Sequence, residues 1–218
     1  MRTHFTRQLQ HVSDDLLRMG SRVEHALAAT AQVLEQRDTD MARRVIAEDR
    51  EIDAARTSVE EQVFDIIAMQ QPVATDLRRL LAMVAIANEL ERAADYAKGI
   101  CKRVIRGMSY THVVDPPPKI RQMAAKAQSM LNTSLDAFVR TDTALARSLS
   151  ATDEQVDQLE DEVIAELLDK VREDPNRIEA VMGWMDVAHV LERLADRATN
   201  IGERVIFIAT NTTEELNT

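Results

Sequence analysis

The sequence has 218 residues, of which 45% are hydrophobic, 29% are charged and only 3% are aromatic. This composition is typical of a globular protein with a buried core, and the abundance of straight-chain residues favours helix over sheet. The formal net charge of -10 argues against a nucleic acid as the main partner, because phosphate binding needs an excess of Lys and Arg.

Cys101 is the only cysteine, so an internal disulfide is excluded. The amino terminus lacks the apolar core of a signal peptide, and no uncharged run exceeds ten residues, which is too short to span a membrane. The sequence alone therefore predicts a cytoplasmic protein.

Six segments carry hydrophobic residues at every third or fourth position, the spacing of amphipathic helices. The predicted helices cover about 5–36, 41–70, 76–107, 120–138, 145–171 and 178–209. Asp38 or Asp40 is expected to cap the second helix, and Thr75 or Asp76 the third. Prolines at positions 72, 116–118 and 175 interrupt the pattern, because proline does not continue a helix.

The second half of the sequence resembles the first. A shift of 101 residues aligns LERAADYAKGICKRVI at 90–105 with LERLADRATNIGERVI at 191–206, and ten of the sixteen positions are identical. Several identical positions are polar, which helical periodicity does not require, so we interpret the pattern as a duplication rather than as chance. The predicted fold is all-α, with two tandem three-helix bundles over residues 1–110 and 111–218.

Pairs of carboxylates interrupt the hydrophobic stripes of four helices. They are Asp49 with Asp53, Glu91 with Asp95, Asp153 with Asp157, and Glu192 with Asp196. In an antiparallel helix pair, residues that are equally far from the turn lie at the same height along the helices. In the first hairpin the two carboxylate pairs are equally far from Pro72, and in the second they are equally far from the bond between Asp174 and Pro175. The sequence therefore predicts two layers of four inward-pointing carboxylates, the first about 30 Å from its turn at a rise of about 1.5 Å per residue.

Four ionised carboxylates in a partly buried layer need a compensating positive charge. An exposed like-charged pair costs only about 0.2–0.5 kcal/mol, but desolvation of each carboxylate costs several kcal/mol. Shared protons, a salt-bridge network or a metal ion can offset this cost, and all-oxygen ligands favour magnesium, manganese or calcium, or iron. The candidate salt-bridge partners are Arg50, Arg56, Arg92, Lys98, Arg193 and Arg197. Of these, Arg92, Arg193 and Arg197 are expected to point away from the carboxylates.

Together these motifs resemble the PhoU family. The resemblance rests on the two phrases LERAADYAKGI and LERLADRATNI, on QQPVATDLR at 70–78, on the segments DREID and DEQVD, and on the duplicated organisation, and it covers nearly the whole chain. It implies that the eight carboxylates form E(D)xxxD pairs that hold mononuclear or multinuclear clusters of iron, manganese, magnesium or zinc. Gly99 stands where the second repeat has Asn200, and EDP replaces QQP in the second hairpin, so the occupancy of the two sites can differ.

The same resemblance implies a regulator without enzymatic activity. A PhoU-like protein is expected to help silence the phosphate-starvation response when phosphate is plentiful, by connecting the phosphate-specific ABC transporter with the phosphate-sensing membrane histidine kinase. The resemblance further implies a cytoplasmic homodimer that is peripheral to the membrane at most.

Two other classes of protein remain alternatives. One is a carboxylate-bridged di-iron oxidase or ferritin-like iron store, which typically uses Glu-x-x-His on two helices. The chain has no Glu-x-x-His, but it has Asp186-x-x-His189 one turn before Glu192, where the first repeat has Ala85 and Asn88. We interpret His189 as a structural imidazole rather than as a ligand. The other alternative is a helical scaffold that binds no metal.

Overall fold

The computed structural model describes residues 2–217, and within this range the chain forms six α-helices and one short 3-10 helix. The helices are α1 (Arg2–Gln36), α2 (Thr39–Gln70), α3 (Thr75–Gly107), α4 (Pro118–Arg140), α5 (Thr143–Glu173), η1 (Pro175–Arg177) and α6 (Ile178–Thr210). These residues contain no strand, so the all-α prediction is confirmed. Residues 1 and 218, which the predicted repeat ranges include, lie outside the described part.

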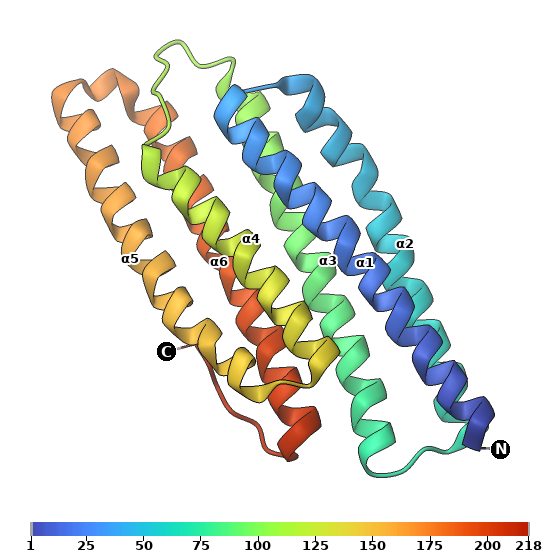
Figure 1. Cartoon of the computed structure of the whole chain (residues 1–218). Helices are drawn as coiled ribbons and strands as arrows, with labels where there is room; N and C mark the ends of the chain where they lie inside the picture. The colour runs from blue at the N-terminus through green and yellow to red at the C-terminus, as the bar shows by residue number, and fades with distance from the viewer. Residues whose placement is uncertain (1, 218) are drawn as a thin grey trace.

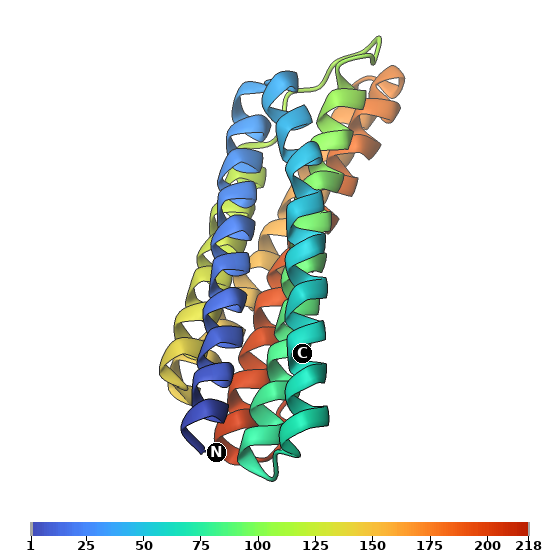
Figure 2. The same ribbon diagram turned by 90° about the vertical axis from the view of Figure 1, so that its right-hand side faces the viewer.

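The six helices form two three-helix bundles that lie side by side (Figure 1). Helices α1, α2 and α3 pack on one another, as do α4, α5 and α6, and the two bundles are joined by contacts of α3 with α6 and of α1 with α4. All helices run along the long axis of an elongated molecule (Figure 2). The two tandem bundles are confirmed, while the boundary at residues 110 and 111 stays a prediction within the segment 108–117 that joins α3 to α4.

Acidic caps begin the second helix of each bundle. The Asp38 carboxylate accepts hydrogen bonds from the backbone N–H groups of Asp40 and Met41, both at 2.9 Å, at the start of α2. Asp142 does the same at the start of α5. Such a cap satisfies N–H groups that have no partner within the helix, so the prediction of Asp38 as the cap of α2 is confirmed.

The predicted cap of α3 is wrong. The residue that immediately precedes α3 is Ala74, which has a φ of 48° and forms no side-chain hydrogen bond to the helix. Thr75 and Asp76 already belong to α3. Ala74 therefore has a positive φ, outside the helical region, in the turn that follows Pro72 and precedes the helix. In the second hairpin Asp174 instead accepts a hydrogen bond from the Asn176 backbone N–H at 3.1 Å and thereby starts η1.

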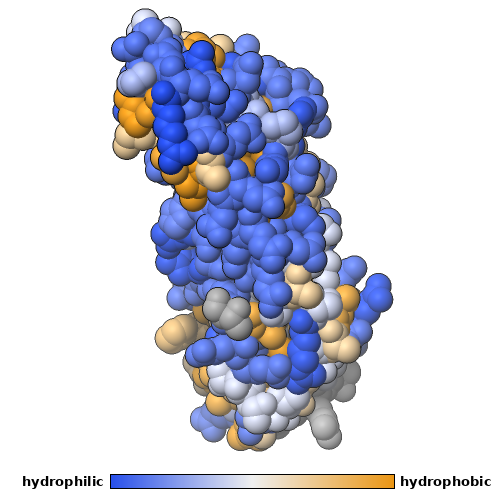
Figure 3. All heavy atoms as spheres, turned by 90° about the vertical axis from the view of Figure 1, so that its left-hand side faces the viewer, coloured by the Kyte–Doolittle hydropathy of each residue, from blue (hydrophilic) through white to orange (hydrophobic). Residues whose placement is uncertain are grey.

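A continuous core of Leu, Ile, Val, Met and Ala side chains runs through both bundles. Close packing of α1 on α4 depends on Gly20, because a Cβ at this position would lie 2.8 Å from Cδ1 of Leu135. The outer face formed around α5 is mostly hydrophilic, with hydrophobic patches toward its ends (Figure 3). Among the described helices, none combines the length and hydrophobicity that crossing a membrane requires.

Candidate metal centres

The first predicted layer lies between α2 and α3. Asp49 is 4% exposed, Asp53 and Glu91 are partly buried, and Asp95 is exposed. Burial raises the pKa of Glu91, and the negative charges of Asp95, Asp53 and Asp49 raise it further. The structure therefore brings these four carboxylates into one electrostatic cluster.

A lysine neutralises much of this first layer. Lys98 follows Asp95 by one turn of α3, and its Nζ lies 2.5 Å from Oδ2 of Asp49 and 2.9 Å from Oδ1 of Asp95. The hydrogen bonds to these two carboxylates raise the pKa of Lys98, so the ammonium stays charged. Arg56 lies near enough to oppose the rise in the pKa of Glu91. In the first repeat, the salt-bridge alternative is therefore realised by Lys98.

The second predicted layer lies between α5 and α6. Asp153 is 6% exposed, Glu192 and Asp196 are partly buried, and Asp157 is exposed. Burial and the charges of Asp157, Asp196 and Glu192 raise the pKa of Asp153 to about 7. Burial and the charges of Asp196 and Glu160 likewise raise the pKa of Glu192 to about 7. Both carboxyl groups therefore titrate near neutral pH.

The second layer has different neighbours from the first. The shift of 101 residues aligns Lys98 with Thr199, whose hydroxyl donates to the backbone carbonyl of Asp196 at 2.8 Å. A shift of 104 residues, which aligns the two Asp pairs of α2 and α5, places Glu160 at the position of Arg56. At both positions a cationic side chain of the first repeat is replaced by a neutral or acidic one.

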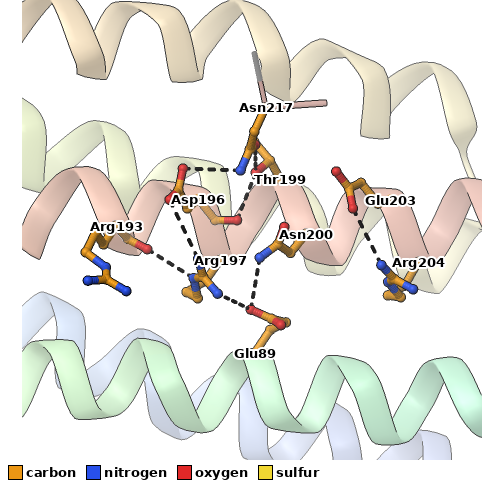
Figure 4. Close-up of polar contacts among 9 residues, drawn as sticks. All are labelled: Glu89, Arg193, Asp196, Arg197, Thr199, Asn200, Glu203, Arg204 and Asn217. Atoms are coloured by element: carbon orange, nitrogen blue, oxygen red, sulfur yellow. Dashed lines mark hydrogen bonds and ion pairs between the residues drawn. The ribbon is translucent and has the colours of Figure 1, made fainter. Parts of the chain in front are cut away.

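Arg197 and Asn217 both contact Asp196 of the second layer (Figure 4). Nη2 of Arg197 lies 3.6 Å from Oδ2 of Asp196, while its Nη1 lies closer, at 3.0 Å, to Oε2 of Glu89 on α3. The expectation that Arg197 points away from the carboxylates is therefore wrong, because the guanidinium reaches both helices. The side-chain amide of Asn217 donates to Oδ1 of Asp196 at 3.2 Å, and its carbonyl accepts from the Thr199 hydroxyl.

Two carboxylates of the second layer form no hydrogen bond with the protein groups that the structure describes, although His189 forms an ion pair with Glu192. Within residues 2–217 Asp153 forms no hydrogen bond or ion pair, although it is almost fully buried. Oε2 of Glu192 is also buried without a hydrogen bond. A buried polar group without a partner costs about 1–3 kcal/mol, and more when it is charged. The residues present therefore fit a bound cation, which would supply the missing partner for these oxygens.

The layers are less buried than the sequence predicts. Of the eight predicted ligands, Asp95 and Asp157 lie exposed, so the expectation that all eight point inward is wrong for these two. Both side chains reach solvent at the open side of their layer. An open side of this kind also gives an ion a path into each layer.

Sequence reasoning missed one part of this region. Nδ1 of His189 lies 3.4 Å from Oε1 of Glu160 and 3.7 Å from Oε2 of Glu192. The interpretation of His189 as a structural imidazole with a hydrogen bond did not identify its partner Glu160, which faces it on α5. The hairpin arithmetic contains the signal, because residues 160 and 189 are equally far from the bond between Asp174 and Pro175.

Comparisons with known proteins agree with this architecture. The PhoU domain model matches residues 16–104 and 120–205, one segment in each bundle. The chain is 36% identical over 214 residues to the phosphate-specific transport system accessory protein PhoU homolog of Clostridium acetobutylicum, covering 98% of this chain and 97% of that protein. It is 31% identical over 206 residues to the phosphate-specific transport system accessory protein PhoU of Edwardsiella tarda, covering 93% and 83% of the two chains.

Solved structures show the same relationship. PhoU from Pseudomonas aeruginosa matches with a TM-score of 0.91 and 31% identity, over 95% of this chain and 100% of that one. The phosphate transport system regulatory protein PhoU from Streptococcus pneumoniae matches with a TM-score of 0.89 and 26% identity, over 97% and 99%. The family model, the relatives and the structures all extend over both repeats, and the chain therefore belongs to the PhoU family.

Proposed function

We propose that this chain is a metal-binding negative regulator of the phosphate-starvation response, and that it acts as an adaptor between the phosphate-specific ABC transporter and the phosphate-sensing histidine kinase. The observation that carries the proposal is the match to the PhoU family over both repeats. Relatives of similar length are named accessory proteins of the phosphate-specific transport system, and a structural neighbour is named a regulatory protein of phosphate transport. The proposed place of action is the cytoplasmic side of the membrane, as a homodimer.

The shape of the molecule supports an adaptor role. Long helix faces offer extended surfaces to partner proteins. Apolar side chains are exposed at the end of the α2–α3 hairpin, where Phe64, Met69 and Val73 are 73%, 72% and 75% exposed. Exposed apolar side chains that are grouped in this way are typical of contact surfaces.

Capture from membranes tests the adaptor role. The full chain, immobilised and incubated with detergent-solubilised membranes, is expected to retain components of both the transporter and the kinase. Phe64→Glu at the exposed hairpin end tests whether this surface takes part, and Glu61→Gln on the exposed face of the same helix is a matched control. Recovery of neither partner by the wild-type chain would contradict the proposal.

The proposed role of the metal is to hold helices in place. A cation between α5 and α6 would join carboxylates from both helices and offset their repulsion, and the second layer supplies unsatisfied oxygens for it. Metal analysis of protein purified without chelator, combined with melting temperatures with and without chelator, tests this role. A scaffold that binds no metal would show no bound ion and no change in melting temperature.

One observation favours the di-iron oxidase or iron store as a second candidate function. His189 lies beside Glu160 and Glu192, so the second layer combines an imidazole with carboxylates as di-iron sites do. Such sites use a histidine from each of two helices, whereas α5 and α6 as described contain His189 alone. Oxygen uptake by the Fe²⁺-loaded protein discriminates between the two functions, because a regulator without enzymatic activity is not expected to consume oxygen.

A further inference from the structure

We infer that the second repeat carries a transition-metal site in which the imidazole of His189 is a ligand, together with the carboxylates of Glu160 and Glu192. One ligand atom from each of these residues lies within 4.8 Å of the other two. Nδ1 of His189 is 3.4 Å from Oε1 of Glu160 and 3.7 Å from Oε2 of Glu192. Separations of 3.4 and 3.7 Å are within the span that two ligand atoms have around an ion bound at about 2.0–2.2 Å from each. The inference adds two ligands to the proposed metal binding and does not depend on the adaptor role.

Helix geometry explains why these three side chains meet. His189 and Glu192 are three residues apart on α6 and therefore share one face of the helix. Glu160 faces His189 because α5 and α6 are antiparallel and both residues are equally far from the turn. The proposed ligands thus come from two regular helices and not from a flexible loop, and their separations are fixed by helix packing.

The adjoining layer provides an independent observation. Asp153 is 6% exposed, and no described residue donates a hydrogen bond to it or forms an ion pair with it. Asp153 and Asp196 are equally far from the turn between α5 and α6, so Asp153 lies in the acidic layer. An almost fully buried carboxylate without a partner, next to a set of metal-ligating atoms, is the arrangement that a cation would satisfy.

The first repeat lacks this set. The positions of Glu160 and His189 are occupied by Arg56 and Asn88 in the aligned first repeat. An arginine cannot ligate a cation, because its guanidinium stays protonated and offers no free lone pair. The site is therefore confined to the second repeat.

The ligands determine the class of metal. Imidazole nitrogen favours first-row transition metals such as Mn²⁺, Fe²⁺ and Zn²⁺, whereas Mg²⁺ and Ca²⁺ prefer oxygen ligands alone. The side chain of His189 is 60% exposed, so a hydrated ion can reach it from solvent. The competing explanation is that protonated His189 only forms ion pairs with the two glutamates, and the following experiment separates the two.

Pulsed EPR of Mn²⁺ added to the full chain detects the imidazole directly. Wild type is expected to show a ¹⁴N coupling from a bound nitrogen, and His189→Asn is expected to remove it. His11→Asn is the matched control, because His11 is also exposed, at 67%, and lies 3.9 Å from a carboxylate, that of Asp15. The coupling is expected to persist in this control.

Titration calorimetry with Mn²⁺ gives a second readout. His189→Asn and Glu160→Gln are each expected to weaken binding by at least about 10-fold, because loss of even a supporting partner of a ligand typically costs about 10- to 100-fold. Excess Mg²⁺ is expected not to displace the Mn²⁺. Circular dichroism checks that both variants remain helical.

Three results would overturn the inference. They are failure of wild type to bind Mn²⁺, binding without a ¹⁴N coupling, and a coupling or an affinity that survives in His189→Asn. Binding without a ¹⁴N coupling and an affinity that survives in His189→Asn are the results that a simple ion pair of His189 predicts. None of these results affects the capture of the transporter and the kinase. The metal ligands and the adaptor role are therefore tested independently, and one can be contradicted without the other.

Discussion

The two carboxylate layers occupy equivalent places in the two repeats but differ in how their charge is balanced. In the first, Nζ of Lys98 lies 2.5 Å from Asp49 and 2.9 Å from Asp95. In the second, no lysine or arginine of the described chain forms an ion pair with Asp153, the counterpart of Asp49. Asp49 and Asp153 occupy equivalent, buried positions in the two repeats, so the difference arises from the side chains around them.

Three aligned replacements produce this difference. From the first repeat to the second, Arg56 corresponds to Glu160, Asn88 to His189 and Lys98 to Thr199. Each replacement removes a positive charge or adds a group that can ligate a metal. The duplication has thus kept the carboxylates, while a lysine bridges two of them in the first layer and no lysine occupies the equivalent position in the second.

The largest expected effect is on the pH dependence of the metal-free protein. The pKa of Asp153 is about 7 against an ordinary value of 3.8. Because the folded state binds this proton more tightly than the unfolded state, the stabilisation is fully present below about pH 4 and is lost as the pH rises through 7, by up to about 1.4 kcal/mol per pH unit. The unfolding free energy of Asp153→Asn minus that of wild type is therefore expected to increase by about 3 kcal/mol as the pH rises from about 4 to 7.

Urea unfolding in the presence of a chelator measures this difference. The groups that face Asp153 are Asp157 and Glu154 on its own helix and Glu192 and Asp196 on α6, and their charges act on its pKa. The difference between Asp153→Asn and wild type is expected to rise with pH. A difference that stays flat would show that Asp153 is ionised at no cost, and the contrast between the layers would then be unfounded.

The next effect in size is stabilisation by metal. Mn²⁺ at about 100 times its dissociation constant is expected to raise the unfolding free energy of wild type by about 2.7 kcal/mol. Asp153→Asn is expected to lose most of this gain, and Asp49→Asn to keep it, because Lys98 already neutralises the first layer. Unfolding with and without Mn²⁺ measures both variants, and an equal loss in the two would contradict the assignment of the metal to the second layer.

Replacing Lys98 should make the first layer resemble the second. Lys98→Thr is expected to destabilise the metal-free protein by about 2 kcal/mol, because removing one partner of a buried ion pair costs about 3–5 kcal/mol and partial exposure reduces this. Side chains of Lys98 and Asp95 are 25% and 50% exposed.

The same variant is expected to bind additional Mn²⁺, which metal analysis measures, and the bound ion should restore part of the lost stability. Lys102→Thr, on the exposed face of the same helix, is the control. If Lys98→Thr unfolds like this control, Lys98 does not balance the first layer.

Much of the fold could be predicted because it depends on short-range signals. The spacing of apolar residues defines the six helices, the prolines mark the turns, and the repeated phrase around Glu91 and Glu192 identifies the duplication. The grouping of carboxylates across each hairpin follows from counting residues to the turn, since helices have a constant rise.

The balance of charge within each layer could not be predicted. Lys98 and Arg197 are both long side chains, and their helix positions alone do not show that Lys98 bridges two carboxylates while Arg197 reaches both Asp196 and Glu89. The exposure of Asp95 and Asp157 depends on which side of each hairpin the third helix covers, which is a property of the packed bundle. Ala74 precedes α3 with a φ of 48°, a positive value that a residue with a Cβ disfavours and that the local sequence does not predict.

The smallest expected effect concerns Asn217, which contacts the second layer from the C-terminal segment. This segment is held by Leu216, which is 6% exposed and whose backbone N–H donates to Oε1 of Glu203 at 3.1 Å. Asn217→Ala removes hydrogen bonds to Asp196 and Thr199 and is expected to lower the unfolding free energy by about 1 kcal/mol. Thermal unfolding compares it with Glu215→Ala, an exposed neighbour. If the two variants unfold alike, Asn217 does not fix Asp196, and the second layer is shaped by α5 and α6 alone.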